Sequence, residues 1–174
     1  GKHSHTKNKA TPVGAREFWF QTGRMTGGSG NILDLSLRGM NNEIPGGVSL
    51  FGINASEINV AANDKSLLKT LSIKLDNVIY QGNDIVYPVS SISGETNGTP
   101  RLQIKGIAND GSKITGVVGK DGFKEKVMIF RKETEGRYEV ELLDYAPNID
   151  KVRKRSIRVD RPTARAKEFG VLKE

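Results

Sequence analysis

Apolar and polar residues alternate along much of this chain, most clearly in the stretch from Arg101 to Leu143. Alternation with a period of two places apolar side chains on one face of a strand, as a half-buried strand requires. Asp-Gly pairs at Asp110 and Asp121 favour tight turns, because glycine readily adopts the positive φ that such turns need. The stretch therefore predicts a four-stranded β-meander. Its expected strands are 101–106, 113–118, 124–130 and 138–142.

Further strands are predicted on the N-terminal side of this meander. Leu33, Leu35 and Leu37 alternate with polar residues, and Leu71, Ile73 and Leu75 repeat the same pattern. A turn is expected at 81–84, where Gly, Asn and Asp cluster. The expected strands are 17–22, 32–38, 48–52, 57–61, 66–80 and 85–89.

The pattern changes after Leu143. Residues 144–150 contain Pro147 and are predicted to be a connector, whereas 152–159 alternate β-branched residues with arginines. That alternation is typical of an exposed edge strand or of a strand added to a neighbour's sheet. Pro162 and Thr163 predict the start of a short helix over 164–169, ended by Gly170.

The predicted fold class is all-β, an antiparallel sandwich or barrel of about ten short strands with extended basic N- and C-terminal arms. The chain has 174 residues, enough for one domain with a hydrophobic core. The expected organisation is a basic arm over 1–16, a β domain over 17–145, and a basic C-terminal arm over 146–174 that holds the edge strand and the short helix.

The net charge of +7 is concentrated at the two ends of the chain. Residues 1–17 carry four basic residues against one acidic residue, and residues 151–174 carry nine against three. The intervening segment has a net charge of −2. A neutral body with basic ends indicates that the ends contact a partner, either a protein surface or nucleic acid.

Catalytic and metal chemistry find little support in the composition. The chain has no cysteine, and its two histidines, His3 and His5, lie in the polar N-terminal segment. A Ser–His pair is therefore excluded from the body, and two histidines alone do not complete a metal site. The glycine-rich run 27–30 lacks the ending of a phosphate loop and is interpreted as a hairpin tip. We expect a protein that is not an enzyme and that uses no cofactor and no metal.

The basic ends supply the candidate partner-binding residues. Lysines and arginines neutralise phosphates without base specificity, whereas the apolar residues among them favour contact with a protein surface. No aromatic residue is interleaved with the basic tail, so stacking on single strands is not indicated. The candidates are Lys2, Lys7, Lys9, Arg16, Lys151, Arg153, Lys154, Arg155, Ile157, Arg158, Val159, Arg161, Arg165, Phe169 and Leu172.

Two stretches resemble known proteins. The chain begins with Gly1 and finishes Leu172-Lys173-Glu174; Leu-x-Glu before a cut with Gly after it resembles the processing signature of prohead proteases in large contractile-tailed phages. This resemblance implies a processed virion structural protein. Residues 113–143 look like the barrel hairpin of ELL-associated transcription elongation factors.

Two functional expectations follow. The first is a structural protein of a virion, capsid or tail, whose arms tie it to neighbouring subunits in largely homo-oligomeric contacts. The second is an intracellular β-barrel subunit of a transcription or ribonucleoprotein complex, with the basic tail on phosphates. No contact with a membrane is expected, because no apolar run reaches the length of a span.

Overall fold

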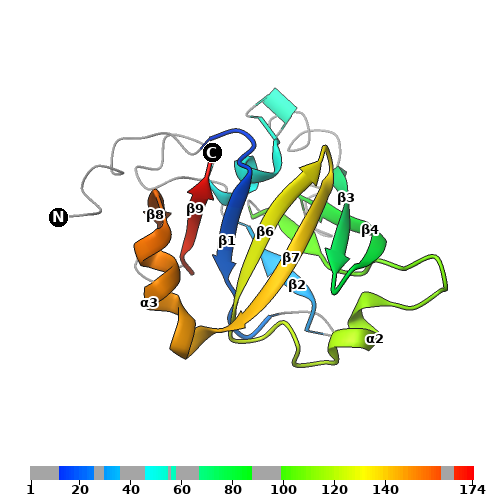
Figure 1. Cartoon of the computed structure of the whole chain (residues 1–174). Coiled ribbons are helices and arrows are strands. Elements are labelled where there is room, and N and C mark those ends of the chain that lie inside the picture. The colour runs from blue at the N-terminus through cyan, green and yellow to red at the C-terminus, as the bar shows by residue number, and fades with distance from the viewer. Residues whose placement is uncertain are drawn as a thin grey trace, which may run out of the picture.

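The computed structural model describes residues 12–25, 30–35, 46–54, 56–57, 67–87, 99–161 and 167–174. Within these ranges, nine strands join in one mixed sheet that curls into a half-barrel (Figure 1). The strands are β1 (Glu17–Gln21), β2 (Ile32–Asp34), β3 (Leu67–Leu75), β4 (Val78–Val86), β5 (Arg101–Gln103), β6 (Lys126–Thr134), β7 (Arg137–Asp144), β8 (Arg158–Asp160) and β9 (Phe169–Lys173). The helices are η2 (Gly47–Phe51), α2 (Ile114–Val118) and α3 (Tyr145–Arg155).

The strand order in the sheet is β2-β5-β4-β3-β7-β6-β1-β9-β8. All neighbouring pairs are antiparallel except β3 and β7, which run parallel through three register pairs from Ser72↔Arg137 to Lys74↔Glu139. The mainly β fold predicted from the alternation is confirmed. The part of the chain that the structure describes holds one curled sheet, however, and not two stacked sheets.

The concave face of the sheet encloses the main core, which contains most of the aromatic residues. Phe18 and Phe20 of β1 point into it, and Phe18 stacks on Phe130 of β6 with ring centroids 5.4 Å apart. Phe51 of η2 packs edge-on against Phe18 at 5.0 Å. Aromatic burial of this kind is a large part of the driving force for folding.

The convex face is covered at one end by α3 (Figure 1). Trp19, which points away from its neighbours Phe18 and Phe20, lies beneath α3 with Ile149 and Val152 of that helix. The sheet therefore has apolar side chains on both faces around β1 and β6, and α3 is a fixed part of the fold.

The predicted meander is confirmed only in its second half. Residues 126–144 form the β6–β7 hairpin, but 113–118 contain α2 in place of a strand. Ile114 and Val118 both pack on the main core, and their spacing of four suits one face of a helix. Arg101–Gln103 pairs with β2 and β4 and not with the hairpin.

The segment predicted as one strand over 66–80 is a hairpin. Asp76 and Asn77 have φ of +49° and +68°, which is the backbone of a tight two-residue turn. The turn predicted at 81–84 is instead the interior of β4, where Gly82 has a φ of +90° and the register shifts by one residue as in a β-bulge. The strand expected over 48–52 is replaced by η2, which covers Gly47–Phe51. Residues 58–61 of the strand expected over 57–61 lie outside the described residues.

The C-terminal segment is not an extended arm. Residues 145–155 form α3, which begins before Pro147 because proline in the first helical turn leaves no hydrogen bond unmade. β9 lies inside the sheet between β1 and β8, with Phe169 and Val171 buried in the main core. Phe169 is thus part of a strand, and residues 162–166 of the predicted short helix are outside the described residues.

Only the last residues of the predicted N-terminal arm are described. The backbone N–H of Gly14 donates to the carbonyl of Ser49 at 2.8 Å, and Ala15 is buried against the main core. This end of the arm therefore lies on η2.

Candidate nucleic-acid interface

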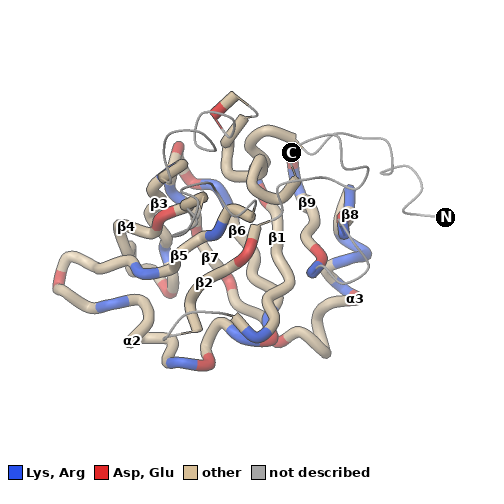
Figure 2. Tube along the Cα trace, turned by 180° about the vertical axis from the view of Figure 1, so that it is seen from behind, with Lys and Arg blue, Asp and Glu red and all other residues tan. Residues whose placement is uncertain are grey.

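The outward face of α3 carries an uncompensated positive charge. Ile149 and Val152 are buried against the sheet, which turns Lys151, Lys154 and Arg155 toward solvent. These three residues are spaced i, i+3 and i+4, so they share one side of the helix. Figure 2 shows Lys and Arg gathered along α3 and the strands beside it.

None of these three cations has an ion pair within the described ranges. Like charges at this spacing repel each other by a few tenths of a kcal/mol, although their place in the last turns of the helix complements the helix dipole. Such a group of exposed cations has its charge available for an anionic partner.

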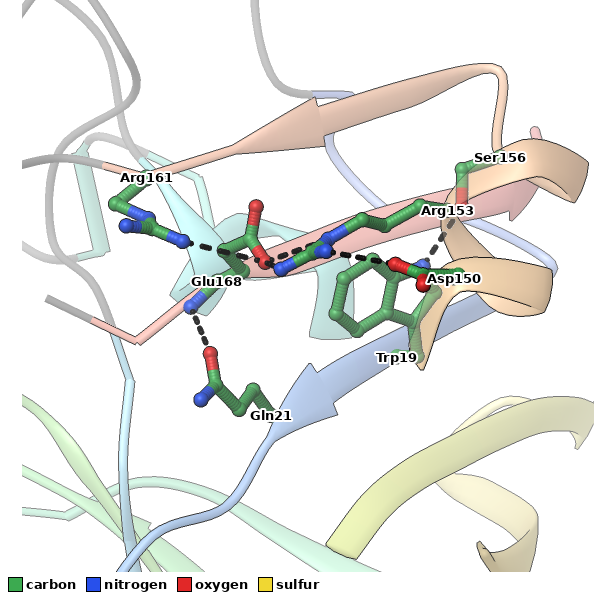
Figure 3. Close-up of polar contacts among 7 residues, drawn as sticks. All are labelled: Trp19, Gln21, Asp150, Arg153, Ser156, Arg161 and Glu168. Carbon is green, nitrogen blue, oxygen red and sulfur yellow. Dashed lines mark hydrogen bonds and ion pairs between the residues drawn. The ribbon is translucent and has the colours of Figure 1, made fainter. Parts of the chain in front are cut away.

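Two further arginines are held beside this face by one carboxylate, Glu168 (Figure 3). Arg153 Nε lies 2.9 Å from Glu168 Oε1, and Arg161 Nη2 lies 3.4 Å from the same oxygen. Arg153 also donates to Asp150 at 3.1 Å. The side chain of Glu168 is only 11% exposed, whereas those of Arg153 and Arg161 are 28% and 44% exposed. One nearly buried acid therefore fixes two guanidinium groups whose edges still reach solvent.

The electrostatics of Arg153 agree with this arrangement. Burial by itself would lower its pKa, but the hydrogen bond and the charge of Glu168 outweigh burial and raise the pKa above its ordinary value. The backbone N–H of Glu168 donates to Gln21 Oε1 at 3.0 Å, which anchors the carboxylate to β1. We call Lys151, Arg153, Lys154, Arg155 and Arg161 the C-terminal basic cluster.

The structure brings together only some of the residues predicted from the sequence. Lys151, Lys154 and Arg155 are exposed on α3, Arg161 is exposed beside them, and Ile157 is 41% exposed. Arg16 is exposed at the start of β1. Lys2, Lys7, Lys9 and Arg165 lie outside the described residues.

Four predicted partner-binding residues are instead part of the fold. Arg158, Val159 and Phe169 are buried, and Leu172 packs on the apolar cluster beneath α3. Arg158 is 2% exposed and pairs with the fully buried Asp160 at 2.6 Å. A buried charge needs a buried partner, so this arginine serves the fold rather than a ligand.

No aromatic side chain is available at the surface for base stacking. The chain has one Trp, four Tyr and six Phe. Ten of these residues are buried and Tyr145 is half-buried. An interface for single strands uses exposed aromatic side chains as stacking platforms, and this surface has none.

A shallow pocket of about 610 Å³ lies where β3 and β7 diverge, with α2 at its edge. Its arginine, Arg131, donates to Glu17 at 2.5 Å and to Glu141 at 2.7 Å. Burial by itself would lower the pKa of Arg131. The hydrogen bonds and charges of these two glutamates outweigh burial, so the pKa is raised above its ordinary value. The pocket is lined by three acidic residues, Asp76, Glu139 and Glu141, against two basic ones, Lys126 and Arg131, so it is a weaker candidate for an anion than the basic cluster.

The structure adds a second group of cations: Lys167, which belongs to the basic tail of the sequence, and Arg24, Lys120 and Lys124, which were not singled out from the sequence. Arg24, Lys120 and Lys124 lie outside the basic ends of the chain. The one signal is that Arg24 and Lys120 each directly follow a glycine. Over the described residues, no cluster of three acidic or histidine side chains could hold a metal ion, and no helix is long and apolar enough to cross a membrane.

A comparison with models of known protein families finds no match to this chain, and a comparison with curated proteins also finds none.

Proposed function

We propose that this protein is a non-enzymatic module that binds the phosphate backbone of double-stranded nucleic acid through the C-terminal basic cluster. The observation that carries the proposal is the outward face of α3, where Lys151, Lys154 and Arg155 have no ion pair within the described ranges. Cations without a partner are free to neutralise phosphates and release counterions.

The held arginines strengthen this interpretation. A guanidinium binds phosphate through two parallel hydrogen bonds, and holding it in place beforehand lowers the entropy lost on binding. Glu168 holds Arg153 and Arg161 in this way. Duplex is favoured over single strand because no aromatic residue is exposed.

The expectation of a virion protein held together by two arms has less support. It depended on an extended C-terminal arm, and that segment folds into the protein's own sheet. The apolar residues of the tail, which favoured a protein partner, include Val159 and Phe169, and both are buried in the chain's own cores.

A salt titration of binding to a short DNA duplex tests the proposal. If the three unpaired cations of α3 each neutralise one phosphate, log affinity should fall with log salt with a slope of about −3. Lys154→Glu should weaken binding at every salt concentration. Lys113→Glu is the matched control, because Lys113 is equally exposed, has no ion pair within the described ranges and lies on the distant turn before α2.

Equal losses for Lys154→Glu and Lys113→Glu would show that net charge alone drives binding, and would contradict a site on α3. A single strand of the same length should bind more weakly than the duplex. Preference for the single strand would also overturn the proposal.

A further inference from the structure

Two glycines, Gly23 and Gly30, contact lysines from other segments of the chain. A Cβ built on Gly23 would lie 2.6 Å from Lys167 Cε, so the lysine stem lies directly on this glycine. A Cβ built on Gly30 would lie 2.6 Å from the carbonyl oxygen of Lys120 and 3.1 Å from Lys124 Cε. Both glycines are buried, and Arg24 follows Gly23 directly. We call Arg24, Lys120, Lys124 and Lys167 the glycine corner.

The backbone of this corner is fixed by hydrogen bonds to β1 and β6. The Thr22 hydroxyl donates to the carbonyl of Phe123 at 2.5 Å, and the Thr22 N–H donates to Lys126 at 2.9 Å. The N–H of Glu125 donates to the carbonyl of Gly23 at 3.1 Å. Segments far apart in the sequence are thereby held side by side before any ligand arrives.

The charge of the corner is positive after its own acids are counted. Lys124 pairs with the exposed Asp121 at 3.2 Å, and Glu125 is exposed nearby. Arg24, Lys120 and Lys167 are exposed and have no ion pair in the part of the chain that the structure describes. Four cations against two anions leave a local excess of positive charge.

The corner is joined to the C-terminal basic cluster through adjacent residues. Lys167 lies against Gly23 in the corner, and the next residue, Glu168, holds Arg153 and Arg161 of the cluster. The two groups therefore approach each other at Lys167 and Glu168, just before β9.

We propose that the glycine corner is a second phosphate-binding site for the same duplex, an inference that rests on the proposed function. A duplex presents one phosphate per ~3.4 Å on each strand, so a surface that extends beyond α3 meets phosphates that α3 does not. The corner adds affinity without base specificity, since phosphates carry no sequence information directly.

Neutralising variants of the full chain test the corner against α3. We expect Lys120→Gln and Lys167→Gln each to reduce the salt slope for a DNA duplex by about 0.9, and the double variant by about twice that amount. Lys113→Gln, which removes an exposed lysine elsewhere, should leave the slope unchanged. Thermal unfolding of each variant controls for loss of structure.

The corner and the proposed function fail in distinguishable ways. If Lys154→Gln reduces the slope while Lys120→Gln and Lys167→Gln leave it at the wild-type value, α3 binds the duplex and the corner does not. If the corner variants reduce the slope and Lys154→Gln does not, the corner stands as the phosphate site and α3 is overturned. A slope that no variant changes overturns both.

Discussion

The indole nitrogen of Trp19 donates a hydrogen bond to the hydroxyl of Ser156 over 2.8 Å, and so ties β1 to the end of α3 (Figure 3). The Ser156 hydroxyl in turn donates to the carbonyl of Val152 at 2.7 Å, within the last turn of the helix. The basic face of α3 is therefore positioned by a buried residue of the first strand. Any change that moves the indole should also move the helix.

A substitution at Gly170 of β9 should displace this indole directly, because the glycine lies against the ring. A Cβ on Gly170 would lie 2.5 Å from Trp19 Nε1, with the buried ring unable to retreat. Gly170→Ala should destabilise the protein by about 1–3 kcal/mol through overpacking, as measured by urea unfolding. Gly116→Ala is the matched control, since a Cβ there meets nothing within 4 Å and the residue lies in α2. It should stabilise by about 0.5–1 kcal/mol, and equal effects of the two variants would contradict this packing.

The buried pair of Arg158 and Asp160 should dominate the stability of β8. Asp160→Ala leaves a buried guanidinium without this carboxylate and should cost about 3–5 kcal/mol in the free energy of unfolding. The double variant Arg158→Met with Asp160→Leu should lose less than Asp160→Ala, because it removes both charges together. Urea unfolding measures both, and a loss in the double variant as large as that of Asp160→Ala would contradict this pairing.

Glu168 should contribute to stability far more than Asp150, although both accept hydrogen bonds from Arg153. Glu168 is nearly buried and contacts two arginines, so Glu168→Gln should destabilise by about 1.5–3 kcal/mol. Asp150 is 82% exposed, and Asp150→Asn should change the free energy of unfolding by less than about 1 kcal/mol. Thermal unfolding of the two variants compares them directly. A larger loss for Asp150→Asn than for Glu168→Gln would contradict the role of Glu168 in holding the two arginines.

Protonation of Glu135, which lies in the turn between β6 and β7, should contribute to the loss of stability at low pH. A hydrogen bond from Lys69 at 2.7 Å, with a second from Lys132, lowers the pKa of Glu135 to about 2. Because the folded pKa lies below the ordinary value of 4.5, its contribution is complete above pH 4.5 and is lost as the pH falls toward 2. NMR titration of the Glu135 carboxyl should show this low pKa.

Lys69→Met should raise the measured pKa of Glu135 toward 4.5, since Lys69 is the largest cause of the shift. Lys105→Met is the control, because that lysine pairs with Asp84 on another strand. An unchanged pKa in Lys69→Met would exclude the ion pair in solution.

The sequence predicts this fold correctly where a run of residues is compatible with only one secondary structure. The apolar run from Val127 to Phe130 lies in the strand predicted over 124–130, and that strand is present as part of β6, where these residues are buried between α3 and the main core. The prediction fails at 66–80, because the alternation of Leu71, Ile73 and Leu75 ends at Asp76 and Asn77, and the prediction includes this two-residue turn in one strand. The prediction fails again at α3. Pro147 favours a connector in the sequence, whereas proline is tolerated in the first turn of a helix, which is its place in α3.

The residues of the candidate interface can be predicted from the sequence only in part. The charge of the tail identified Lys151, Lys154 and Arg155, since lysines and arginines on a helix surface need no tertiary information. The same charge pattern wrongly included Arg158, because only the fold supplies its buried partner Asp160. The glycine corner could not be predicted as a group, since the contacts of Gly23 with Lys167 and of Gly30 with Lys120 and Lys124 exist only in the folded chain.

The place of β1 between β6 and β9 has a consequence for synthesis of the chain. During synthesis, β1 gains one neighbour only after residue 134 has been made and the other only after residue 173. Trp19 stays uncovered until α3 and β9 have both been made. Contacts between distant parts of a chain are slow to form, so the Phe18–Phe20 segment must be protected from aggregation until β9 has emerged, about 150 residues later.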